Sequence, residues 1–160
     1  MMKVEEIIKR YEDLKNELNI LDIQISSFEG ISENDVIEMM TFSQTQDERV
    51  ITSGTTDKTS KIAASYSKRT SQENDEMYNF LLKRHIEIKN EIDFFESAIS
   101  RMKYKEVAEA LFIQRLTWPE VESLFNISHA TIGRYRREIV KELEKAYSLR
   151  NEQIEAFLLS

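Results

Sequence analysis

One short segment carries the side chains best suited to chemistry with a partner. Residues 128–137 read Ser-His-Ala-Thr-Ile-Gly-Arg-Tyr-Arg-Arg, with three arginines and no acid, in a chain whose net charge is −7. The guanidinium of arginine is a planar fork of N–H donors that fits the O6 and N7 acceptors of guanine or the oxygens of a phosphate. This composition indicates recognition of nucleic acid.

The residues around this segment predict two helices joined by a tight turn. Thr117 is expected to cap the first helix, with Glu120 bonding back in a capping box. Pro119 suits the first turn, where its missing N–H costs nothing. Asn126 is expected to end that helix, because Asn tolerates the left-handed conformation. Ser128 is expected to cap the second helix.

Apolar residues define the predicted buried faces of these two helices. Val121, Leu124 and Phe125 form a stripe on the first helix, and Ile127 is expected to be a buried plug in the turn. The inward positions of the second helix recur at steps of three and four: Ile132, Tyr135, Ile139 and Leu143. A second helix presented in this way is the recognition element of a helix-turn-helix.

The outer side of the second helix and the first turns of both helices are the predicted DNA-binding surface. The first turn of the recognition helix, over 128–143, would meet base edges in the major groove, and its arginines would reach guanines or phosphates. The predicted contact residues are Thr117, Trp118, Ser128, His129, Ala130, Thr131, Arg134, Arg136, Arg137 and Lys141. An ordinary helical hairpin with a solvated basic face is the alternative.

These residues also resemble a known module. The pattern is Leu116-Thr117-x-x-Glu120-Val121, then Phe125-x-Ile127-Ser128-x-x-Thr131-Ile132, then Ile139-Val140-x-x-Leu143. It looks like the module with which bacterial sigma factors read the upstream promoter element. Its Leu-Thr-Trp start resembles the sigma-like late-gene activators of phages of Gram-positive bacteria, the ArpU and RinA type. The resemblance covers roughly 103–147.

The resemblance implies a phage or prophage transcription regulator that binds double-stranded DNA, with N-terminal helices that dimerise or contact RNA polymerase. Three positions depart from the family pattern. Glu122 stands where a small residue is usual, and Asn126 and Arg115 stand where glycines are common. Either a slightly opened helix crossing or an outward rotamer is expected to accommodate Glu122.

Composition limits the protein class. The 160 residues are 32% charged and 41% hydrophobic, and three Gly and one Pro leave little turn material for a sheet-rich fold. We therefore expect an all-α protein. The absence of Cys excludes disulfides and thiolate metal sites, and the two histidines, His85 and His129, do not lie in a metal-binding spacing. We expect no enzyme activity, no cofactor and no metal site.

Hydropathy argues against a membrane location. No apolar run approaches the roughly 20 residues of a membrane span, and the acidic start Met-Met-Lys-Val-Glu-Glu is not a signal peptide. The expected location is the cytoplasm of a bacterial host cell. Residues 1–40 hold ten acidic and four basic side chains, so few cations remain for DNA and the expected affinity of a monomer is modest.

Two long stretches carry heptad patterns. Apolar residues repeat at three and four over 1–28 and over 72–102, which predicts either helices packed inside their own domain or a coiled coil within the chain or between chains. A homodimer through these helices is expected. The expected domains are a helical region over 1–102 and a helix-turn-helix domain over 103–160. A leading helix over 103–114 is expected to continue from the second long helix.

The remaining segments are a predicted short helix, a predicted loop and an apolar C-terminal segment. Ser32 and Asp35 predict a capped short helix that carries Val36, Ile37, Met39, Met40 and Phe42. Residues 43–71, with twelve Ser or Thr among 29, predict a mobile loop with at most a short helix over 57–67. The apolar residues of 150–160 predict a tail that docks on the bundle or on a partner chain.

Two other functions remain open from the sequence. A small terminase-type DNA-recognition subunit of a phage packaging motor also joins a helix-turn-helix to helical oligomerisation segments. A coiled-coil interaction protein that binds no DNA would tolerate changes at Arg134, Arg136 and Arg137.

Overall fold

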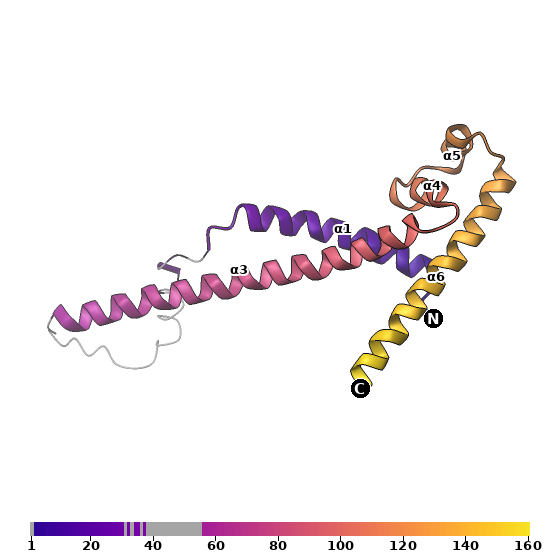
Figure 1. Ribbon diagram of the computed structural model, residues 1–160. Coiled ribbons are helices and arrows are strands. Elements are labelled where there is room, and N and C mark those ends of the chain that lie inside the picture. The colour runs from indigo at the N-terminus through magenta and orange to yellow at the C-terminus, as the bar shows by residue number, and fades with distance from the viewer. Residues whose placement is uncertain (1, 31, 33, 36, 38–55) are drawn as a thin grey trace. The chain divides into compact units, whose positions relative to one another are not determined.

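The computed structural model describes residues 2–30, 32, 34–35, 37 and 56–160. Over these residues the protein is all-α, as predicted, and no strand is present (Figure 1). The elements are helix α1 (Val4–Ser26), α3 (Thr56–Ser100), α4 (Lys105–Ala108), the π-helical turn η1 (Glu109–Ile113), α5 (Trp118–Phe125) and α6 (His129–Leu159).

The chain divides into two compact units. Unit 1 comprises Met1–Asn19 and Glu87–Ser160, and unit 2 comprises Ile20–Ile86. The predicted boundary between 102 and 103 lies inside unit 1. Whether 103–160 folds as a separate domain stays a prediction.

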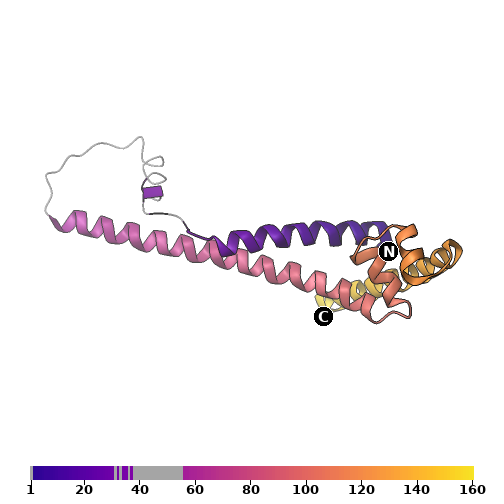
Figure 2. The ribbon, with the colours of Figure 1, turned by 90° about the horizontal axis from the view of Figure 1, so that it is seen from above.

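In unit 1 the two heptad seams pack against each other. The Tyr11 ring stacks on Phe95 with centroids 4.1 Å apart, and the Tyr11 hydroxyl donates to Glu96 Oε1 at 2.7 Å. Early residues of α1 thus meet late residues of α3, so the helices are antiparallel (Figure 2). Seam residues of both helices and of α6 are buried: Val4, Ile7, Tyr11, Ile88, Ile92, Phe95, Ile99, Ile139, Leu143 and Tyr147.

The same pairing recurs in unit 2. His85 Nε2 lies 2.7 Å from Asp22 Oδ1, and the Phe28 and Tyr78 rings lie 5.2 Å apart. The two heptad helices therefore contact each other within one chain, and whether they form a coiled coil stays a prediction. Pairing between chains stays a prediction.

The C-terminal end of α1 leads into a glycine. Gly30 has φ +76°, a backbone conformation that favours glycine, and a Cβ there would lie 2.6 Å from Oδ1 of the Asn74 side chain, which would have to move. Ser32 and Asp35 then form the predicted capping box: the Asp35 N–H donates to Ser32 Oγ and the Ser32 N–H to Asp35 Oδ2, each at 3.2 Å. The apolar residues predicted to follow, Val36, Met39, Met40 and Phe42, lie outside the described residues.

Helix α3 corrects the prediction of a loop over 43–71. It begins at Thr56, so 56–71 is helical, and 43–55 lies outside the described residues. Residues 56–71 contain no Gly or Pro, and their hydroxyls can bond within the helix. The buried Thr70 donates to the Tyr66 carbonyl at 2.8 Å. Such bonds satisfy the polar groups that composition alone assigns to a loop.

The chain turns between α3 and the next helix, so the predicted continuity is wrong. The Met102 N–H donates to the Ile99 carbonyl at 3.1 Å, which tightens the end of α3, and α4 begins only at Lys105. The segment predicted as a helix over 103–114 is α4 followed by η1. Arg115, at φ 58°, ends it, and the Leu116 N–H donates to the Ala110 carbonyl at 2.9 Å.

The described helices contain no stretch that is both long and apolar enough to cross a membrane.

Candidate nucleic-acid interface

A tight corner joins α5 to α6. Asn126, with φ 54° and ψ 49°, is left-handed as predicted, and its N–H donates to the Glu122 carbonyl. Ser128 Oγ accepts from the Thr131 N–H at 3.2 Å and lies 2.8 Å from Thr131 Oγ1. The predicted cap of α6 is confirmed, and it fixes where that helix begins.

Thr117 caps α5 in a slightly different way from the prediction. Its Oγ1 accepts from the Glu120 N–H at 3.4 Å, as expected. The Glu120 carboxylate, however, accepts from the Thr117 hydroxyl at 3.0 Å rather than from its backbone. The hydroxyl of Thr117, a predicted DNA contact, thus both donates and accepts a hydrogen bond within the protein.

The corner packs through fewer apolar residues than predicted. Val121 and Ile132 are fully buried, but Leu124 is 61% exposed and Ile127 is only half-buried. Helix α5 has eight residues, so it buries one narrow face, and Val121 occupies it. Tyr135 is half-buried rather than in the core, because it stacks on Tyr104 with centroids 3.9 Å apart.

Four of the predicted residues share the outer face of α6. Ala130, Arg134, Arg137 and Lys141 follow one another at steps of four, three and four, and all are exposed. Positions spaced in this way lie in one stripe along a helix. The exposed Glu138, one turn after Arg134, borders them. We call this set the cationic stripe.

Arg136 lies on a different side of α6. It is half-buried, and its guanidinium carbon lies 5.8 Å from the centre of the Phe112 ring. It also lines a hollow with Val4 and Glu144, whose carboxylate accepts from the Val4 N–H at 3.0 Å. Arg136 therefore faces the N-terminal end of α1, away from the cationic stripe.

Trp118 and His129 form a cluster with Glu122 at the corner. The Trp118 and His129 rings lie 4.6 Å apart, and His129 Nδ1 lies 3.1 Å from Glu122 Oε1. The His129 side chain is still 72% exposed. No pattern in the sequence signalled this pairing of Glu122 with His129, and how the helix crossing accommodates Glu122 stays a prediction.

Sequence reasoning also missed Lys103 and Tyr104. Lys103 Nζ lies 5.3 Å from the centre of the Tyr104 ring, which stacks on Tyr135, and the Arg134 guanidinium carbon lies 5.7 Å from the Tyr135 ring. Two exposed cations thus flank one aromatic stack beside the cationic stripe. An aromatic residue next to lysine is the only signal that could have indicated this.

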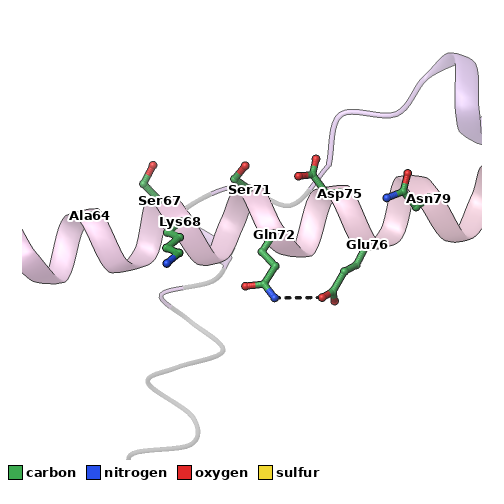
Figure 3. Close-up of a pocket in the computed structure, with 8 residues that line it drawn as sticks. All are labelled: Ala64, Ser67, Lys68, Ser71, Gln72, Asp75, Glu76 and Asn79. Carbon is green, nitrogen blue, oxygen red and sulfur yellow. Dashed lines mark hydrogen bonds between the residues drawn. The ribbon is translucent and has the colours of Figure 1, made fainter.

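A separate hollow in unit 2 lies along α3. Figure 3 shows Ser71 and Asp75 pointing to one side of the helix, and Gln72 and Glu76 to the other. The bond from Gln72 Nε2 to Glu76 Oε1, at 3.3 Å, joins neighbours one turn apart. Within the described residues no three His, Asp or Glu side chains gather where they could hold a metal ion. The hollow offers no convergent set for catalysis.

Comparison of the chain with protein-family models, with curated proteins and with solved structures finds no match. The assignment of a function therefore depends on the geometry of the corner and on the sequence resemblance.

Proposed function

We propose that the protein is a sequence-specific transcription regulator of phage or prophage type that inserts α6 into the major groove of double-stranded DNA. The observation that carries the proposal is the cationic stripe. It combines Arg134, Arg137 and Lys141 on one exposed face directly after a capped corner.

The dimensions and chemistry of this face support the proposal. A helix with its side chains is about 10–12 Å wide, and the major groove is about 12 Å wide. Arg134 lies in the second turn of α6, where a side chain can reach base edges. Arg137 and Lys141 follow along the helix, where phosphates would lie. The resemblance to sigma-like activators points to the same use of this helix.

The proposal is tested by selecting binding sites from a random duplex pool and measuring affinity by fluorescence anisotropy. Arg134→Ala should weaken binding to the selected site by about 5- to 150-fold, as for loss of a bidentate guanine contact. Arg69→Ala is the matched control, because it removes an exposed arginine from α3. Equal affinity of Arg134→Ala and the control would refute the role of Arg134, and absence of any binding would refute the function.

The salt dependence of binding gives a second test. Arg137 and Lys141 on phosphates predict a slope of log K against log salt of about −2 for one copy, and about twice that for two copies. Lys141→Ala should reduce the slope by about 1 for each copy bound, and Lys89→Ala on α3 should leave it unchanged. A slope near zero would contradict contact between the stripe and DNA.

One observation favours the packaging-motor alternative. The last turns of α6 expose apolar side chains, with Phe157 77% and Leu158 73% exposed. Such a surface favours assembly with other copies. Mass measurement separates the functions: a ring of eight or more copies favours a terminase-type subunit, and a monomer or dimer favours a transcription regulator, with RNA polymerase as a further partner to test.

A further inference from the structure

We propose that Glu122 is a positioning residue that sets the tautomer of His129 and thereby makes His129 a reader of amino groups on bases. This inference rests on the proposed function, because the reading takes place in the major groove. The inference adds to the proposed function the class of base that His129 recognises and a role for Glu122 at the corner between α5 and α6.

Two neighbouring side chains, Trp118 and Glu122, contact the His129 imidazole. His129 is the first residue of α6, its ring lies 4.6 Å from Trp118, and its Nδ1 lies 3.1 Å from Glu122 Oε1. A Cβ on Gly133, one turn further along α6, would lie 3.7 Å from the Trp118 ring, so Trp118 covers this side of the helix. The ring is held and yet largely exposed.

The carboxylate decides which ring nitrogen carries hydrogen. An ionised carboxylate only accepts hydrogen bonds, so Nδ1 must donate. In the neutral imidazole the remaining nitrogen, Nε2, is then an acceptor. An acceptor in the major groove pairs with the N4 amino group of cytosine or the N6 amino group of adenine. The opposite tautomer would donate instead to guanine O6 or N7, thymine O4 or adenine N7, and would find no acceptor on cytosine.

His85 provides an internal comparison. Its Nε2, rather than its Nδ1, lies 2.7 Å from the carboxylate of Asp22. By the same reasoning His85 carries its hydrogen on Nε2. The two histidines of the chain are therefore expected to be opposite tautomers in one molecule.

The first arm of the test uses the free protein. Long-range ¹H–¹⁵N correlation spectra, recorded at a pH where both imidazoles are neutral and assigned with His129→Ala, should show hydrogen on Nδ1 of His129 and on Nε2 of His85. Glu122→Ala should move the His129 hydrogen to Nε2 and leave His85 unchanged. Glu122→Gln, whose amide oxygen still accepts, should restore the wild-type pattern. Hydrogen on Nε2 of His129 in the wild-type protein overturns the proposal.

The second arm repeats the duplex selection at the same pH. His129→Ala should lose a preference of roughly 3- to 10-fold at one position of the site, where the wild-type protein prefers adenine or cytosine. Glu122→Ala should select against cytosine and accept guanine or thymine there, and Glu122→Gln should behave like the wild-type protein. An unchanged site in His129→Ala overturns the proposal and leaves the proposed function standing.

A wild-type protein without any sequence preference overturns both the proposed function and the base-reading role. The spectra then still report whether Glu122 sets the tautomer, so the two failures are distinguishable.

Discussion

Two non-glycine residues hold the left-handed conformation at the ends of neighbouring helical segments. Arg115 has φ 58° and Asn126 has φ 54°. Asn tolerates this region through its short polar side chain, whereas a long side chain pays about 1–2 kcal/mol. Arg115 also pairs with Glu12 at 3.0 Å, but its side chain is mostly exposed, so this ion pair contributes little.

Arg115→Gly should therefore be more stable than Arg115→Ala by about 1 kcal/mol. Both variants lose the ion pair to Glu12, and only the glycine relieves the backbone, so their difference isolates the conformational cost. Urea denaturation of the two variants measures it. An alanine variant at least as stable as the glycine variant would show that the turn is not strained at this position.

Tyr147 makes stability depend on pH at the alkaline end. Burial raises its pKa to about 12; Arg150 opposes the increase and Glu91 adds to it. In the unfolded chain a tyrosine ionises near pH 10. The unfolded state therefore loses the proton first, and folding stability should be constant below about pH 10 and fall as pH rises toward 12.

Tyr147→Phe should reduce the loss of unfolding free energy between pH 10 and 12 by up to about 2 kcal/mol. Denaturation midpoints measured at intervals across this range test the effect. Burial and the hydrogen bond to Glu96 also raise the pKa of Tyr11, so a second change, Tyr11→Phe, should flatten the curve further. Parallel curves for wild-type and Tyr147→Phe proteins would rule out this source of pH dependence.

At the scale of single elements, helix caps and seams follow from local sequence. The caps at Thr117 and Ser128 and the end of α5 at Asn126 are where the sequence predicts them. The start of α3 was not predictable from composition, because Ser and Thr suit loops, turns and the interior of a supported helix alike. At the end of α3 no Gly or Pro signals the turn that follows.

The contribution of the Ser128 cap of α6 to the free energy of unfolding can be measured. Ser128→Ala should lower the free energy of unfolding by about 1 kcal/mol, because the Thr131 N–H loses its acceptor, and Ser128→Gly should cost only a few tenths. Ser123→Ala, at an exposed position within α5, is the control and should change stability little. Equal losses for Ser128→Ala and Ser123→Ala would show that the cap does not stabilise α6.

At the scale of the whole molecule, the division into units gives a prediction about a shortened chain. Asn19 and Glu87 are the residues at which unit 1 passes to unit 2 and back. They lie on antiparallel helices, eight and nine residues from the paired Tyr11 and Glu96, so they lie at similar levels along the two helices. A short connection can therefore join them without disturbing the core of unit 1.

A chain with 20–86 replaced by a short Gly- and Ser-containing turn should remain helical and unfold cooperatively. It should keep the Tyr11–Phe95 stack, which near-ultraviolet circular dichroism can follow, and any DNA affinity of the full chain. Phe95→Ala in the shortened chain is the control and should cost about 3–5 kcal/mol. Loss of cooperative unfolding in the shortened chain itself would show that unit 1 depends on unit 2.

The amino-acid sequence by itself determined the all-α class, the heptad seams, the caps at Thr117 and Ser128 and the left-handed Asn126. Each of these depends on residues within a turn or two of one another. Only the tertiary structure decided that the seams of α1 and α3 meet within one chain. It also placed Arg136 beside Phe112 and paired His129 with Glu122. These outcomes depend on which helix faces meet, and such meetings join residues far apart in the chain, where local periodicity carries no information.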